Sequence, residues 1–184
     1  MKKSKLYIET YGCQMNVADS EVVAAILQQH NYELTENPEL ADLVLINTCS
    51  IRENAENRIR SRLDNLKPLK DKNKDLTIGI IGCMAERIKE KLLEEKKILD
   101  IVAGPDSYRE LPELIKIAKK KKKGINTLLS MEETYAEIRP VRLDVNKISA
   151  FISIMRGCNN LCAYCVVPFT RGRERSRDPE TIIR

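Results

Sequence analysis

The stretch Asp42-Leu-Val-Leu-Ile-Asn-Thr-Cys-Ser-Ile-Arg-Glu53 decides how the chain is organised. Its first six residues form a short apolar run, which is typical of a buried strand. Ser50 and Glu53 have the spacing of a capping box, which predicts that a helix follows over residues 51–65. The turn between this strand and this helix carries Cys49.

The same plan of strand, turn and helix occurs on both sides of this stretch. The further predicted strands and helices, in chain order, are 5–10, 16–29, 76–81, 85–96, 99–103 and 108–118. Strands that alternate with helices predict an α/β fold whose sheet is parallel and whose crossovers are right-handed.

Three cysteines occupy equivalent strand-to-helix turns, about 35 residues apart, and we call Cys13, Cys49 and Cys83 the first cysteine set. A single buried cysteine is usually a small hydrophobic residue. Three at the carboxyl ends of parallel strands lie on the edge where open α/β sheets bind ligands, which predicts a shared metal or cluster site. Asn16 and Asn47 flank these turns and could donate hydrogen bonds to such a site or serve as turn and cap residues.

The other cysteines, Cys158, Cys162 and Cys165, form a second cysteine set with the spacing C-x-x-x-C-x-x-C. One loop can direct three such thiolates to a common point, and thiolates of this kind hold iron–sulfur clusters. Three ligands leave one iron of a 4Fe-4S cluster open. Residues 148–155 are apolar and rich in β-formers, so we expect them to form the first strand of a second domain.

We therefore expect an N-terminal α/β domain over residues 1–123, a connector over 124–147 with room for one strand, and the beginning of a second domain over 148–184. Five lysines, residues 119–123, close the last helix of the first domain and suit a solvated helix end.

The chain has 184 residues and a formal net charge of +5. Its N-terminus lacks a signal region, and no run is long enough to cross a membrane, which predicts a cytoplasmic protein with reduced thiols. Glycine-rich phosphate-binding fingerprints are missing. The only histidine, His30, is expected to be exposed at a helix end, which disfavours zinc sites with four protein ligands. Arginines that would attract a polyanion flank the second set, namely Arg156, Arg171, Arg173, Arg175 and Arg177.

The whole chain resembles the methylthiotransferase branch of the radical S-adenosylmethionine enzymes. The resemblance rests on Thr10-Tyr-Gly-Cys-Gln-Met-Asn16, on Asn47-Thr-Cys-Ser-Ile-Arg-Glu53, on Gly82-Cys83, and on the loop from Arg156 to Arg177. The first two motifs look most like the members that act on N6-isopentenyladenosine in tRNA. They look less like the members that act on threonylcarbamoyl-adenosine or on a ribosomal protein.

The resemblance implies an N-terminal methylthiotransferase domain followed by the start of a radical S-adenosylmethionine (β/α) partial barrel. It implies two 4Fe-4S clusters. The cluster on the second set would bind S-adenosylmethionine at its open iron and cleave it to a 5′-deoxyadenosyl radical. The auxiliary cluster on the first set would carry the sulfur that is inserted.

The resemblance also suggests contacts for other side chains. Tyr164 could pack beside the cluster or the cofactor adenine, or serve ordinary packing. Arg171, Arg173 and Arg177 could bind RNA phosphates, or equally the cofactor carboxylate and nearby acidic side chains.

The function that this resemblance implies is a tRNA methylthiotransferase, which adds a methylthio group to carbon 2 of N6-isopentenyladenosine next to the anticodon. Its partners would be the tRNA anticodon stem-loop and an electron donor such as flavodoxin or ferredoxin, and the sulfur donor is left open. The later barrel strands and the C-terminal RNA-binding domain of the family are missing, so we expect this chain alone not to turn over. An iron–sulfur electron-transfer module and a reduced-thiol or zinc structural protein are the alternatives.

Overall fold

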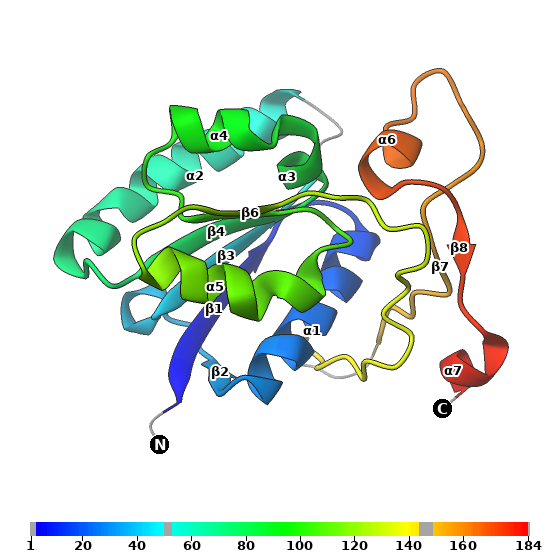
Figure 1. The fold of residues 1–184 in the computed structure, drawn as a ribbon, viewed down its shortest axis with the longest axis horizontal. Coiled ribbons are helices and arrows are strands. Elements are labelled where there is room, and N and C mark those ends of the chain that lie inside the picture. The colour runs from blue at the N-terminus through cyan, green and yellow to red at the C-terminus, as the bar shows by residue number, and fades with distance from the viewer. Residues whose placement is uncertain (1–2, 50–52, 144–148, 184) are drawn as a thin grey trace.

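The structure is a computed structural model that describes residues 3–49, 53–143 and 149–183. Its centre is a six-stranded, entirely parallel sheet with the strand order β2-β1-β3-β4-β5-β6 (Figure 1). The strands are β1 (Ser4–Thr10), β2 (Tyr32–Leu34), β3 (Leu43–Thr48), β4 (Thr77–Gly82), β5 (Ile101–Ala103) and β6 (Gly124–Asn126). The predicted α/β fold with a parallel sheet is confirmed.

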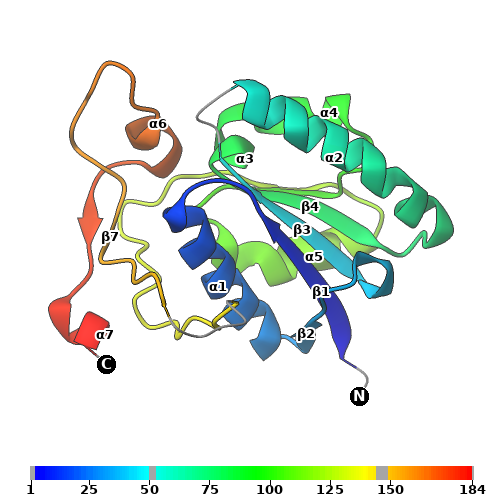
Figure 2. The same ribbon diagram turned by 180° about the vertical axis from the view of Figure 1, so that it is seen from behind.

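Helices cover both faces of this sheet, as Figures 1 and 2 show. The helices of this part are α1 (Gln14–Gln29), α2 (Glu53–Lys72), α3 (Cys83–Ile88), α4 (Glu90–Glu95) and α5 (Leu111–Lys119), with the 3₁₀ turns η1 (Pro38–Leu40) and η2 (Tyr108–Glu110). Side chains of α1 and α5 pack in one apolar core with one face of the sheet, and those of α2, α3 and α4 pack in a second core on the other face. β3 and β4 lie between the two cores and are buried along their whole length, which explains their continuous apolar runs.

Four strands and two of the helices lie where the sequence predicts them. β2 and β6 were not predicted individually, because strands of three residues carry too little pattern to recognise, although the connector was expected to have room for a strand. β6 pairs with β5, so the sheet extends into the stretch 124–147 that we expected to connect two domains. The helix predicted over 108–118 begins as the 3₁₀ turn η2 and continues as α5.

Two helix predictions need correction. The single helix predicted over 85–96 is wrong: α3 and α4 are separate helices that meet at Lys89, whose φ of 50° lies outside the helical region. The helix predicted over 51–65 is longer and continues through Pro68 to Lys72. The capping box at its start depends on Ser50, which lies outside the described residues.

The C-terminal part departs further from the prediction. The strand expected over 148–155 is wrong over its described residues before Met155: β7 (Met155–Arg156) pairs antiparallel with β8 (Arg175–Ser176). A parallel barrel does not begin here, because residues 149–154 belong to no strand and the strand pair described in this part of the chain, β7 with β8, is antiparallel. The remaining elements are α6 (Val167–Arg171) and α7 (Pro179–Ile183), and α6 contacts α3.

Candidate functional site

The first cysteine set lies at the carboxyl edge of the sheet, on the turns after three neighbouring strands. Cys13 directly precedes α1, Cys49 follows β3, and Cys83 is the first residue of α3. The chain leaves β1 toward β2 and leaves β3 toward β4, in opposite directions along the sheet. The edge between β1 and β3 is therefore a topological switch point, the place where open α/β sheets bind ligands.

Asn16 and Asn47 join the turns of this edge by hydrogen bonds between their side chains. Asn16 is fully buried, and its Nδ2 donates to Asn47 Oδ1 at 2.9 Å and to the carbonyl oxygen of Thr48 at 3.2 Å. Asn47 Nδ2 donates in return to the carbonyl oxygen of Asn16 at 2.8 Å. Asn16 Oδ1 accepts from the backbone N–H of Cys13 at 3.3 Å and lies 3.4 Å from Cys13 Sγ. The amide donors thus hold the turns, and one amide oxygen faces a cysteine of the first set.

Two glycines allow the turns to approach one another closely. Gly12 has a φ of 138°, and a Cβ there would lie 2.7 Å from the Cβ of Cys49. Gly82 has a φ of 92°, and a Cβ there would lie 2.7 Å from the carbonyl oxygen of Thr48 and would overlap Asn47 Oδ1. Both positions therefore need glycine for the backbone angle and for space.

The three thiols share this edge but do not converge on one point. In the part of the chain that the structure describes, no group of three His, Cys, Asp or Glu side chains is placed to hold a metal ion. The structure has no disulfide among the six cysteines, all of which lie in its described residues, and Cys49 and Cys83 are buried. Soft thiol donors on adjacent turns, beside the glycine-lined approach, fit an iron–sulfur cluster by donor chemistry.

The second cysteine set lies on the loop that joins β7 to β8. The backbone N–H of Cys158 donates to the carbonyl oxygen of Gly172 at 3.2 Å, which closes the base of this loop. Cys162 is exposed, while Cys158 and Cys165 are half-buried. Tyr164 is 94% exposed, so the structure does not give it the packing role that was one of the two expected for it. The loop therefore exposes Cys162 and the ring of Tyr164 at its tip, above an anchored base.

Buried arginines and aspartates anchor this loop. Pairing with acidic side chains was one of the alternatives expected for Arg171, but the sequence did not identify the aspartates. We call Asp19, Asp106, Arg156, Arg171 and Arg175 the arginine–aspartate cluster. Arg156 donates to Asp19 Oδ1 at 2.7 Å, and Arg171 donates to Asp19 Oδ2 at the same distance. Arg175 donates to Asp106 Oδ2 at 2.6 Å. The arginines thus reach from both ends of the cysteine loop to acidic side chains of the sheet domain.

Asp19 is the centre of this cluster. It is 2% exposed, and Tyr108 Oη also donates to its Oδ2, at 3.1 Å. Burial alone would raise the pKa of the Asp19 carboxyl, but the guanidinium groups of Arg156 and Arg171 hold that pKa below its usual range. A charged residue between the buried Ala18 and Val22 of a predicted helix was the available sequence signal.

The arginines expected to bind a cofactor or RNA divide into two groups. Arg171 is 2% exposed and paired inside the protein, and Arg177 donates to the carbonyl oxygens of Ser153 and Ala136. Arg173 alone of the three is exposed. His30, as predicted, is exposed at the C-terminal end of α1, about 24 Å along the helix from Cys13.

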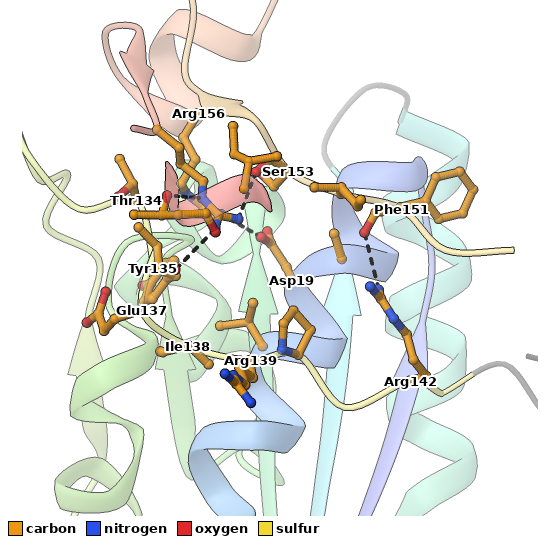
Figure 3. Close-up of a pocket in the computed structure, with 18 residues that line it drawn as sticks. Asp19, Thr134, Tyr135, Glu137, Ile138, Arg139, Arg142, Phe151, Ser153 and Arg156 are labelled. Atoms are coloured by element: carbon orange, nitrogen blue, oxygen red, sulfur yellow. Dashed lines mark hydrogen bonds and ion pairs between the residues drawn. The ribbon is translucent and has the colours of Figure 1, made fainter. Parts of the chain in front are cut away.

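A cavity of about 560 Å³ lies beside the arginine–aspartate cluster. Figure 3 shows Asp19 and Arg156 directed toward one another near one end and Arg142 directed toward Phe151 near the other. Arg142 Nη1 donates to the carbonyl oxygen of Phe151 at 3.3 Å. The described residues that line the cavity include no cysteine, so the cavity is separate from both cysteine sets. No helix among the described residues has the length and apolar character to span a membrane.

Comparison with known proteins shows the family of this chain. Residues 5–104 match the Uncharacterized protein family UPF0004. A tRNA-2-methylthio-N(6)-dimethylallyladenosine synthase of Amoebophilus asiaticus is 60% identical over 179 residues, 97% of this chain and 37% of the relative. Proteins of the same name from Chloroherpeton thalassium and Azobacteroides pseudotrichonymphae are 54% and 58% identical, over 99% and 97% of this chain and 40% of each relative. The chain thus spans about two fifths of the length of these relatives. Since the family match covers more than half of the chain, the first cysteine set included, the chain belongs to the Uncharacterized protein family UPF0004.

Proposed function

We propose that this chain is the cluster-bearing part of a tRNA methylthiotransferase, which adds a methylthio group to carbon 2 of N6-isopentenyladenosine next to the anticodon. The observation that carries the proposal is the meeting of three cysteine turns at the switch point of a parallel sheet. The relatives named above support the choice of reaction, since 97–99% of this chain aligns with synthases of that name.

The first cysteine set is proposed to hold an auxiliary 4Fe-4S cluster. Its three turns follow β1, β3 and β4, and these strands end close to the same height in the sheet. Thr10 is opposite Asn47, and Thr48 is opposite Gly82. Asn16 and Asn47 join the turns by mutual hydrogen bonds, so the proposed cluster would be held on turns whose backbones are already fixed relative to one another. We infer that the domain around this site extends to the end of β6.

The second cysteine set is proposed to hold the 4Fe-4S cluster that binds S-adenosylmethionine. When bound, the two clusters and this cofactor would supply the one-electron cleavage, the radical and the inserted sulfur. The protein's part is to hold the loop at its base and leave its tip open. The exposed Tyr164 is available to a cofactor ring, and the exposed Arg173 is available to a carboxylate or an RNA phosphate. The anticodon stem-loop of tRNA and a cytoplasmic electron donor, flavodoxin or ferredoxin, are the proposed partners.

Anaerobic reconstitution of the full-length protein with iron and sulfide tests the cluster assignment. We expect two 4Fe-4S clusters, and about half of the iron after Cys13, Cys49 and Cys83 are all changed to alanine. The matched variant with Cys158, Cys162 and Cys165 changed to alanine should lose the other half. Zinc in place of iron, or iron that is unaffected by both triple variants, would overturn the assignment.

Mass spectrometry of tRNA from cells that lack the full-length protein tests the substrate. We expect the 2-methylthio group to be missing from N6-isopentenyladenosine and to return when the gene is restored. If the nucleoside keeps its methylthio group while a ribosomal protein or threonylcarbamoyl-adenosine loses one, the proposed substrate is wrong.

A further inference from the structure

Arg171 lies between the two cysteine sets and contacts one of them. It is the last residue of α6, six residues after Cys165. Its Nε donates to Cys83 Sγ at 3.2 Å, and its Nη2 donates to Asp19 Oδ2 at 2.7 Å. One planar guanidinium therefore joins the cysteine loop to α1 and to the first residue of α3.

The position of this guanidinium is fixed from several sides. The residue is 2% exposed. Its carbonyl oxygen accepts a hydrogen bond of 2.7 Å from Arg175 Nη2, and Arg175 is itself paired with Asp106. Asp19 is held by Arg156 on its other oxygen. The Nε–H is thus aimed at the sulfur by contacts that do not involve the sulfur.

We propose that Arg171 is a positioning residue for the first cysteine set: it orients the Cys83 sulfur for cluster binding and stabilises the negative charge of the bound cluster. The proposal rests on the proposed function, because it assumes a cluster on the first set. N–H groups directed at ligand sulfurs are among the features that set the reduction potential of iron–sulfur clusters. Groups that orient metal ligands in this way are commonly worth about 10–100-fold in metal affinity.

An ion pair with Asp19 alone does not account for the contact between Arg171 and the Cys83 sulfur. Pairing with Asp19 uses Nη2 alone and does not require a hydrogen-bond acceptor at Nε, yet the sulfur of Cys83 lies there. Lysine at position 171 keeps the positive charge but has one nitrogen, which cannot reproduce the fork that spans Asp19 and Cys83. Arg171→Lys therefore separates the contact with sulfur from the presence of a buried charge.

The test uses full-length protein in which the second cysteine set is changed to alanine, so that only the cluster on the first set is reconstituted. Arg171→Lys and Arg171→Gln are compared with Arg173→Lys, a change at an exposed arginine of the same segment. The measurements are the EPR spectrum of the reduced cluster, its midpoint potential, and the rate of iron loss to a chelator.

We expect both variants of Arg171 to show a more negative midpoint potential, an altered EPR spectrum and about tenfold faster iron loss. Arg173→Lys should match the parent protein. Asp19→Asn, which removes the ion pair but not the donor to sulfur, should lower the unfolding midpoint and alter the EPR spectrum less than Arg171→Lys does.

The inference is overturned if Arg171→Lys leaves the spectrum, the potential and the rate of iron loss unchanged. It is also overturned if Arg171→Lys and Asp19→Asn both lower the unfolding midpoint while neither changes the spectrum. A parent protein that binds no cluster would instead contradict the proposed function, so the two failures are distinguishable.

Discussion

Replacement of Asp19 by asparagine should remove much of the stability of the chain. Asp19 accepts from Arg156 and Arg171, both at 2.7 Å, and from Tyr108 at 3.1 Å, and all these groups are buried. Asparagine keeps the size of the side chain but removes the negative charge between two guanidinium groups.

The size of the loss follows from the charges left behind. Breaking a buried ion pair by removing one partner costs about 3–5 kcal/mol, because the other charge is left uncompensated. Asp106 remains nearby, with its Oδ1 3.5 Å from Arg156 Nε, which favours the lower end of that range. We expect the free energy of unfolding to fall by about 3 kcal/mol, which lowers the melting temperature of a chain of this size by about 6–12 °C.

Urea unfolding followed by far-ultraviolet circular dichroism measures this loss, since the chain has no tryptophan. A double-mutant cycle of Asp19→Asn with Arg171→Met should give a coupling energy above about 1 kcal/mol. The reason is that Arg171→Met removes one of the two positive charges that Asp19→Asn leaves uncompensated. The control is Asp71→Asn, which breaks an exposed pair with Lys74 and should cost less than about 1 kcal/mol. An Asp19→Asn variant within about 1 kcal/mol of wild type would refute the reasoning.

The wild-type protein and the Asp19→Asn variant should differ in how their stability responds to acid. Because the pKa of Asp19 is lowered in the folded state, its contribution is fully present above the unfolded pKa, near 3.9, and is lost as the pH falls through the lower folded value. The difference between wild type and Asp19→Asn should therefore be constant from about pH 5 to pH 8 and shrink below about pH 4. A difference that shrinks between pH 6 and pH 8 would point to another titrating group.

Two further changes test the geometry of the cysteine edge by urea unfolding. Gly82→Ala should cost about 3 kcal/mol, because the added Cβ meets the carbonyl oxygen of Thr48 and the side chain of Asn47. Gly172→Ala, at a similar φ of 73°, should cost only about 1 kcal/mol, because the added Cβ would make ordinary van der Waals contact with Leu129 at 3.8 Å; equal losses would contradict the close approach at Gly82. Glu86→Gln should stabilise the protein by less than about 1 kcal/mol at pH 7, because burial raises the pKa of this carboxyl, its Oε1 has only the exposed Lys89 as an ion-pair partner, at 3.2 Å, and its Oε2 has no hydrogen-bond partner among the described residues. The gain should shrink as the pH falls through the raised pKa, and a destabilised variant at pH 7 would show that the pair with Lys89 outweighs the cost of burial.

The fold was predictable from sequence wherever a strand is long and buried on both faces. Residues 43–48 and 77–82 are buried throughout, so their apolar runs are unbroken and easy to recognise. β2 and β6 have three residues each and depend on pairing with β1 and β5, which no local pattern records. The break between α3 and α4 depends on the positive φ of Lys89, and it was not predictable because the apolar residues on both sides keep a helical spacing.

The place of the first cysteine set on the sheet was predictable from topology, but the contacts around it were not. Topology alone places Cys13, Cys49 and Cys83 on one edge of the sheet, and the structure has them there. The sequence does not show that Arg171 turns inward to Asp19, because 152 residues separate the two and a run of alternating arginines looks the same whether it is solvated or buried. Whether a charged side chain can be buried depends on whether the fold brings it a partner of opposite charge, and here that partner is distant in sequence.

The burial of these arginines changes what the basic segment can do. An arginine held between two aspartates has little charge left to offer a polyanion, whereas an exposed one keeps it. Of the arginines that flank the second cysteine set, Arg156, Arg171 and Arg175 are 4%, 2% and 7% exposed, so the attraction of the proposed tRNA partner to this segment would depend on the exposed Arg173 and the half-buried Arg177. The buried arginines instead fix where the cysteine loop stands relative to Cys83. The spacing of the two proposed clusters is thus set by ion pairs that salt screens weakly, and it should persist at ionic strengths that release RNA.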